Sequence, residues 1–361
     1  MQSFTMYNTT RSGIIRQGPS NTKTRLRFIR QGSGPAWYRP SKYISLLLWR
    51  FFFLTVIIES GMLMPARSQS NEPCYQWEKV NGINIFYRKA GNPANHAIVL
   101  LHGFPSSSIM YEDLIRLLGN DFFLIAPDYP AHGYSDAPSP EMYRYTFENI
   151  TNTMDSLLEK LGIHKYSLFM QDYGAPVGFR LAVKHPERIE ALIVQNGNAY
   201  MEGFPEAQDP NGELQQYWKD KNKKYEDNWI NYYREANAGT PDQWKLNPCV
   251  NPDRRVLNAS VMLKPGRLAI FMDLWFDYGN NVKSYPLWHA YFAKYQPPML
   301  ITWGKEDTYF IVPGALAYLH DLPKAEIHLL NGGHWAASEA NAGEIEIAQL
   351  IKSFFERNII H

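Results

Sequence analysis

Short runs of apolar, β-branched residues alternate with longer segments of helical periodicity from Trp77 to the end of the chain. The first two runs, 77–80 and 83–88, flank Asn81-Gly82, a dipeptide typical of the two-residue turn of a β-hairpin. Further strands are predicted at 97–101, 122–126, 166–169, 191–194, 299–302 and 326–330. Helices are predicted at 111–118, 146–161, 175–185, 314–320 and 342–357. A hairpin followed by repeated strand–helix units predicts an α/β fold, with a mostly parallel sheet and helices on both of its faces.

This alternation stops for about a hundred residues between Gly197 and Pro298, where the chain is aromatic and mostly helical in period. An insertion between two strands of a parallel sheet lies over the carboxyl ends of the strands, where ligands bind in open α/β sheets. We therefore predict a core formed by residues 69–198 and 299–361, and a helical cap formed by residues 199–298.

The N-terminal segment differs from the rest of the chain in composition. Residues 1–43 are polar and basic without a usable period, which predicts a disordered tail. Residues 44–58 are apolar apart from one arginine and two hydroxyl residues, and this run is shorter than the about twenty residues that span a bilayer. The pattern over 44–68 is that of a signal peptide with a cleavage site at Ala66-Arg67-Ser68, or of a membrane anchor. Export or membrane association is favoured, and an organelle-targeting presequence is the third alternative.

The net charge of +1 hides an asymmetry between this segment and the rest of the protein. The first 58 residues contain nine Lys and Arg and no acidic residue, which leaves 27 basic and 35 acidic residues in the remainder, a net charge of −8. An acidic body argues against a nucleic-acid partner. The two cysteines, Cys74 and Cys249, lack metal-ligand spacing, so they are either two free thiols or a disulfide pair in an oxidising compartment.

Two segments at strand ends carry candidate chemistry. After the strand at 97–101, Gly103 allows a turn that can direct the backbone N–H of Phe104 at a reacting atom, although an ordinary loop is the alternative. Asp172 stands where a strand ends and a helix begins, which is the position of the nucleophile in a strand–turn–helix elbow. Gly174 supplies the small residue that such a sharp turn needs. Taken alone, this position favours the role of a helix N-cap for Asp172, which is common for Asp there.

Two further strand ends change this assessment. Asp307 follows the strand at 299–302, and His334 follows the strand at 326–330. Nucleophile, acid and base therefore occur in the chain order Asp172, Asp307, His334, each at the carboxyl end of a predicted strand. This combination predicts a catalytic triad with an aspartate nucleophile.

Outside its N-terminal segment, the chain is similar to the branch of the α/β-hydrolase fold that contains epoxide hydrolases and haloalkane dehalogenases. The resemblance, carried by the strand-end residues above, implies that Asp172 attacks an sp³ carbon and forms a covalent alkyl ester. It implies that His334, oriented by Asp307, activates the water that hydrolyses this ester. It also implies that the backbone N–H groups of Phe104 and Tyr173 stabilise the oxyanion, and that no cofactor or metal is required.

The two subfamilies differ in how they stabilise the leaving group: epoxide hydrolases use cap tyrosines, and dehalogenases use Trp or Asn donors. Three motifs resemble the epoxide-hydrolase form: His102-Gly103-Phe104-Pro105, Gly333-His334-Trp335 and Tyr278-Gly279-Asn280. The resemblance implies that His102 and Trp335 contact the substrate. It also implies that Tyr278 donates a proton during ring opening, with Tyr217 as the second donor. The alternatives to Tyr217 are Tyr225, Tyr232 and Tyr233.

Other residues keep the identity of the leaving group open. Gln171 before the nucleophile resembles some haloalkane dehalogenases, and Tyr173 stands where both subfamilies favour Trp. We therefore expect an epoxide hydrolase that forms diols from a small apolar electrophile and water, with a haloalkane dehalogenase as the alternative. A non-catalytic protein that binds hydrophobic ligands is an alternative of another class. A serine esterase would need a nucleophile at the elbow, whereas Ser106 to Ser108 lie in the predicted oxyanion loop. The oligomeric state is left open.

Overall fold

The computed structural model of the protein describes residues 71–240, 251–335 and 343–359. The two predicted N-terminal segments and Cys249 lie outside these ranges, whereas Cys74 is an exposed free thiol. No helix within the described ranges is long and apolar enough to cross a membrane.

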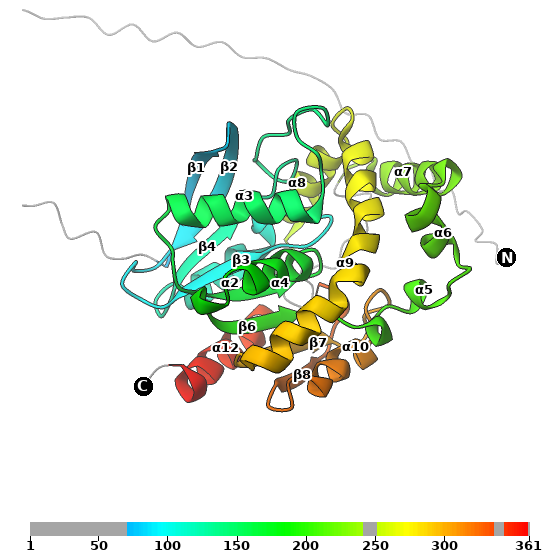
Figure 1. Ribbon diagram of the computed structural model, residues 1–361. Helices are drawn as coiled ribbons and strands as arrows, with labels where there is room; N and C mark the ends of the chain where they lie inside the picture. The colour runs from blue at the N-terminus through cyan, green and yellow to red at the C-terminus, as the bar shows by residue number, and fades with distance from the viewer. Residues whose placement is uncertain (1–70, 241–250, 336–342, 360–361) are drawn as a thin grey trace, which may run out of the picture. The chain divides into compact units, whose positions relative to one another are not determined.

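One eight-stranded sheet has the strand order β1-β2-β4-β3-β5-β6-β7-β8 (Figure 1). The strands are β1 (Cys74–Val80), β2 (Ile83–Ala90), β3 (Ala97–Leu101), β4 (Phe123–Pro127), β5 (Tyr166–Gln171), β6 (Ile189–Gln195), β7 (Met299–Gly304) and β8 (Glu326–Leu330). β2 pairs antiparallel with β1 and β4, and the other neighbouring strands are parallel. Between β1 and β2, Asn81 and Gly82 have φ values of 50° and 90°, as the predicted hairpin turn requires. The predicted α/β fold with a mostly parallel sheet is confirmed.

Two hydrophobic clusters cover the two faces of the sheet, because successive side chains of a strand point to opposite sides. In β5, Leu168 and Met170 belong to one cluster and Phe169 to the other. Helices α2 and α12 supply the cluster of Phe169, and α3, α4 and α10 supply the opposite one. The helices outside the insertion are η1 (Ser108–Tyr111), α2 (Glu112–Leu118), α3 (Phe147–Lys160), α4 (Gly174–Lys184), η2 (Pro186–Arg188), α10 (Val312–Ala317), η4 (Tyr318–His320) and α12 (Gly343–Asn358).

The insertion between β6 and β7 contains only helices among its described residues. These are η3 (Met201–Gly203), α5 (Pro205–Gln208), α6 (Glu213–Asp220), α7 (Lys223–Asn237), α8 (Pro252–Met262) and α9 (Arg267–Tyr295). The long helix α9 packs against α3 and α4 and also against α6, α7 and α8, so it joins the insertion to the helices beside the sheet (Figure 1). The division of the chain into core and cap domains stays a prediction.

Candidate active site

Asp172 occupies a sharp turn between β5 and α4, with φ of 49° and 6% of its surface exposed. A side chain at Gly174 would place its Cβ 2.1 Å from the carbonyl oxygen of Leu101, so only glycine allows this turn to lie against β3. The Asp172 carboxylate accepts a hydrogen bond from the backbone N–H of Phe104, 2.6 Å from Oδ1. Tyr173, not Asp172, is the N-cap residue of α4, and its side chain makes no capping hydrogen bond. The carboxylate therefore faces the loop after β3 rather than capping the helix.

His334 lies between the two predicted carboxylates. Its Nε2 is 3.5 Å from Oδ2 of Asp172, and its Nδ1 is 2.7 Å from Oδ2 of Asp307. Oδ1 of Asp307 accepts hydrogen bonds from the backbone N–H groups of Tyr309 and Phe310, at 2.7 and 2.9 Å. Because Asp307 is held in place by two backbone donors, it can orient the imidazole ring with Nε2 toward Asp172. The structure brings the three residues of the predicted triad together.

The charge of His334 depends on these two neighbours. Burial disfavours the imidazolium, but hydrogen bonds and charge interactions with Asp172 and Asp307 outweigh it and raise the pKa of His334 to about 9. The ring is therefore protonated at neutral pH in the free protein. Any reaction that neutralises Asp172 removes one of the two interactions and lowers the pKa of His334.

Asn196 is a buried residue of the site that the sequence analysis missed. Its Nδ2 donates to Oδ2 of Asp307 at 2.6 Å, its Oδ1 accepts from the N–H of Gly304 at 2.8 Å, and its carbonyl accepts from the N–H of Asp172 at 3.2 Å. Asn196 thus holds the Asp307 carboxylate through its side chain and the Asp172 backbone through its carbonyl. The sequence contained an indication of this role, because Asn196 directly follows the apolar strand β6, at the same edge of the sheet as the other site residues.

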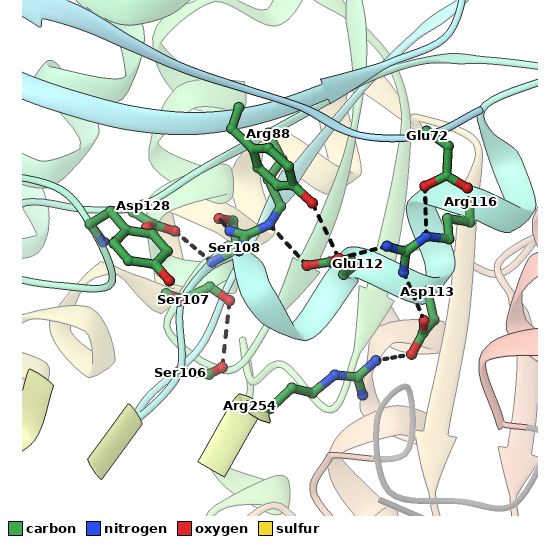
Figure 2. Close-up of polar contacts among 12 residues, drawn as sticks. Glu72, Arg88, Ser106, Ser107, Ser108, Glu112, Asp113, Arg116, Asp128 and Arg254 are labelled. Carbon is green, nitrogen blue, oxygen red and sulfur yellow. Dashed lines mark hydrogen bonds and ion pairs between the residues drawn. The ribbon is translucent and has the colours of Figure 1, made fainter. Parts of the chain in front are cut away.

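The loop that carries Phe104 is anchored by buried charges (Figure 2). Oδ1 of Asp128 accepts from the backbone N–H of Ser108 at 2.7 Å, and Arg88 contacts both the hydroxyl of Ser108 and the carboxylate of Glu112. Burial raises the pKa of Asp128, and the nearby Arg88 partly offsets that increase. A paired charge in a buried position holds its partners in one geometry, so this network fixes the loop that presents the Phe104 N–H.

The insertion is tied to the same region by Arg254 of α8. This buried side chain pairs with Asp113 of α2 (Figure 2) and lies 3.2 Å from Glu344 of α12. Nearby, Nδ2 of Asn258 lies 3.4 Å from the hydroxyl of Ser106 in the loop after β3. The helices of the insertion are therefore connected to α2 and to the loop that faces Asp172.

Replacing Gly103 with alanine is expected to destabilise the protein and to impair the site. The added Cβ would lie 2.1 Å from Oε1 of Gln171 and 2.5 Å from Cβ of Asp172. Overpacking of this kind costs about 1–3 kcal/mol, and it would displace the Phe104 N–H from Oδ1 of Asp172. Chemical denaturation measures the free energy of unfolding. Gly333→Ala is the matched stability control, because its added Cβ meets no atom within 4 Å. A Gly103→Ala protein as stable as the control would contradict this geometry.

A cavity of about 160 Å³ opens onto Asp172 and His334. Its volume is close to the roughly 150 Å³ of an engineered apolar cavity that holds benzene. Aromatic side chains form most of its wall: Phe104, Tyr173, Phe204, Trp229, Tyr232, Tyr233, Phe271, Trp275, Tyr309, Phe310 and Trp335. The polar side chains on the wall, besides Asp172 and His334, are Glu206, Asn237 and Arg255. Among the described residues, no group of three or more His, Cys, Asp or Glu side chains could hold a metal ion.

Three residues that the sequence analysis assigned to the site do not line this cavity. Tyr278 is buried behind Tyr173, with ring centroids 5.9 Å apart. The hydroxyl of Tyr217 donates to the carbonyl of Met272 at 2.9 Å. Burial keeps His102 neutral by lowering its pKa well below 6.5, and both ring nitrogens bond to backbone atoms of the surrounding loops. The polar atoms of Tyr217 and His102 are therefore bonded to backbone atoms of the protein and are not available to a substrate.

The other predicted residues, Phe104, Tyr173 and Trp335, do line the cavity. Among the predicted alternatives to Tyr217, Tyr232 and Tyr233 also lie on its wall. Burial raises the pKa of Tyr233, and Asp172 is among the charges that raise it further.

The chain is similar to several known proteins. A family model described as alpha/beta hydrolase fold matches residues 96–340. An uncharacterized hydrolase of Saccharomyces cerevisiae is 36% identical over 287 residues, which are 77% of this chain and 95% of that protein. Haloalkane dehalogenase 1 of Mycobacterium tuberculosis is 39% identical over 101 residues, 28% of this chain and 33% of the dehalogenase.

Two solved structures show the same fold at low sequence identity. An epoxide hydrolase from Vigna radiata has a TM-score of 0.61 and 20% identity, and the match covers 81% of this chain and all of that one. A haloalkane dehalogenase variant from Bradyrhizobium elkanii has a TM-score of 0.60 and 18% identity, with 80% of this chain and all of that one covered. At these identities the likeness concerns the fold and leaves the leaving group undecided.

Proposed function

Because the chain belongs to the alpha/beta hydrolase fold family and is a hydrolase of that fold, we propose that it opens a small epoxide to a diol through a covalent ester on Asp172. One observation carries the proposal. The Asp172 carboxylate lies in a mostly aromatic cavity, with Oδ1 bonded to the Phe104 N–H and Oδ2 facing His334. A carboxylate is a weak nucleophile toward esters, because its acyl adduct reverts, but it can attack a strained sp³ carbon.

In the first step, Oδ2 of Asp172 forms a bond to one epoxide carbon while the carbon–oxygen bond of the ring breaks. The electron pair of that bond goes to the ring oxygen, which takes a proton from a tyrosine hydroxyl. Tyr173 and Tyr233 are the proposed donors, since both line the cavity. Burial raises the pKa of each hydroxyl and Asp172 raises it further, so both remain protonated donors at neutral pH.

In the second step, Asp172 is a neutral ester, so the pKa of His334 is lower and the ring releases its proton to solvent. Water then attacks Cγ of the ester while neutral His334 takes one proton of this water. The ring regains its proton from solvent once Asp172 is a carboxylate again. The negative charge of the tetrahedral intermediate develops on Oδ1, which already accepts from the Phe104 N–H in the free protein. Collapse breaks the Cγ–Oδ2 bond, and the product oxygen takes the proton back from His334. The second water proton restores the tyrosine hydroxyl, and Asp172 is a carboxylate again.

A haloalkane dehalogenase is the second candidate, and the similarity to named haloalkane dehalogenases favours it. The first step would be the same, with a halide as leaving group and no proton donor needed. Trp229, Trp275 and Trp335 line the cavity and carry N–H groups. The N–H of Trp275, however, is directed at the hydroxyl of Tyr225, 3.2 Å away, rather than at an incoming halide.

The two candidates are separated by offering the full-length protein matched small epoxides and bromoalkanes. We expect diol formation with a kcat/KM at least about tenfold above that of halide release, the factor that about 1.4 kcal/mol of additional transition-state stabilisation supplies. Chromatography measures the diol, and ion analysis measures the halide in parallel. Halide release without diol formation would establish the second candidate instead.

A further inference from the structure

Asn237, the last residue of α7, contributes a buried amide to the wall of the cavity that contains Asp172 and His334. Only 5% of Asn237 is exposed. Its Nδ2 donates to the carbonyl of Tyr233 at 2.7 Å and to Sδ of Met262 at 3.0 Å. Because an amide oxygen could not face the Tyr233 carbonyl so closely, these contacts fix which end of the amide is nitrogen.

The amide oxygen of Asn237 therefore points away from these two acceptors. Within residues 71–240, 251–335 and 343–359, no donor is bonded to it. Nothing in the catalytic steps above uses Asn237, so this acceptor is available to a ligand in the cavity.

The charges near Asn237 restrict the kind of ligand group. Arg255, whose guanidinium donates to the carbonyl of Ala236 at 2.6 Å, and Glu206, whose Oε1 is 3.4 Å from the hydroxyl of Tyr225, line the same cavity. Because these two side chains carry opposite charges, the cavity wall as a whole favours neither an anionic nor a cationic ligand group. A neutral hydroxyl can donate to Asn237 and also accept, without introducing a charge into an aromatic cavity.

We propose, building on the function proposed above, that the substrate is a small epoxide with a hydroxyl group, and that Oδ1 of Asn237 accepts the hydrogen bond from this hydroxyl. The cavity of about 160 Å³ limits such a substrate to about the size of benzene. Asn237 thus acts as a specificity residue: it distinguishes an epoxy alcohol from an epoxide of the same shape that ends in a methyl group. A site built around an unpaired polar group rejects the analogue that leaves this group unpaired.

The test compares pairs of epoxides that differ only by a terminal hydroxyl or methyl group, in a series of increasing chain length. We expect the wild-type protein to favour the hydroxylated member of at least one pair by about tenfold in kcat/KM, and Asn237→Leu to bring this ratio to about one. Asn228→Leu, an exposed asparagine on the same helix, is the matched control and should leave the ratio unchanged.

A wild-type ratio near one across the series, or an unchanged ratio in Asn237→Leu with a wild-type melting temperature, would overturn the inference while leaving ester formation on Asp172 intact. A stronger preference for an epoxide with a terminal carboxylate would also overturn it. Binding is measured without turnover as well, through quenching of the cavity tryptophans by small diols and their methyl-terminated isosteres. Tighter diol binding that Asn237→Leu abolishes supports the inference even if no epoxide is opened, so it is separable from the proposed reaction.

Discussion

Diol formation by the Asp172→Ala variant is expected to be at least about 10⁴-fold slower than by the wild-type protein, the scale seen when a covalent nucleophile is removed. In the proposed reaction Asp172 supplies the oxygen that bonds to carbon, and His334 acts only in the later hydrolysis. Single-turnover and steady-state rates with a small epoxide measure the effect. The matched control is Asp121→Ala, which removes a surface carboxylate paired with Lys352 and should leave the rate unchanged.

The origin of the product oxygen provides a second readout for the same residue. Since hydrolysis breaks the Cγ–Oδ2 bond, a single turnover in ¹⁸O-labelled water should put the label into Asp172, and the first diol should carry an enzyme oxygen. Direct attack of water on the epoxide would put the label into the diol at once and would exclude the ester.

Ligand binding and ester hydrolysis by the Asp172→Ala variant also distinguish the other functional classes. Tight ligand binding that survives the substitution, together with a wild-type protein that turns nothing over, would favour a non-catalytic binding protein. Ester hydrolysis that persists in Asp172→Ala would point to a serine nucleophile. The structure argues against a serine nucleophile, because Ser106, Ser107 and Ser108 are buried between β3 and α2 rather than at the elbow.

The sheet and the positions of Asp172, Asp307 and His334 were predictable because they depend on local patterns and topology. The runs at 97–101 and 326–330 coincide with β3 and β8. Short apolar runs bounded by turn residues are typical of buried strands. Once the strands are parallel, their carboxyl ends share one edge of the sheet, and residues that follow them in the chain converge there.

The side chains contributed by the insertion were not predictable in the same way. Helix α9 is buried on several sides by α3, α4, α6, α7 and α8, so its apolar positions do not mark one face. Motif similarity pointed to Tyr278, which packs behind Tyr173, whereas Tyr233 of the neighbouring helix α7 lies on the cavity wall. The packing between distant segments decides which faces of the inserted helices lie next to Asp172. The periodicity of a single segment cannot predict these faces.

The His334→Gln variant is expected to accumulate the covalent ester that the wild-type protein hydrolyses. Alkylation needs only the Asp172 carboxylate and a proton donor, whereas hydrolysis needs a base, whose removal slows a step by about 10²–10⁴-fold. Mass spectrometry should find an increase equal to the mass of the epoxide on the peptide that contains Asp172. His164→Gln, which changes an exposed histidine that does not line the cavity, is the control and should show no adduct.

The pH dependence of ester hydrolysis tests the same step in the unmodified protein. In the free protein the two carboxylates raise the pKa of His334 to about 9, so the ring is an imidazolium at neutral pH. Esterification neutralises Asp172, and the pKa of His334 must then fall below about 9, because only Asp307 still stabilises the charged ring. The rate of ester decay should therefore rise with pH, with a midpoint below about 9, and become constant at higher pH. The rate of alkylation should not show this midpoint. Decay that does not vary with pH, or an absent adduct in His334→Gln despite lost turnover, would remove His334 from the role of base. The same ring would thus be charged while substrate is attacked and become a base once the ester has formed, which lets one histidine serve a two-step reaction without any change in the positions of its neighbours.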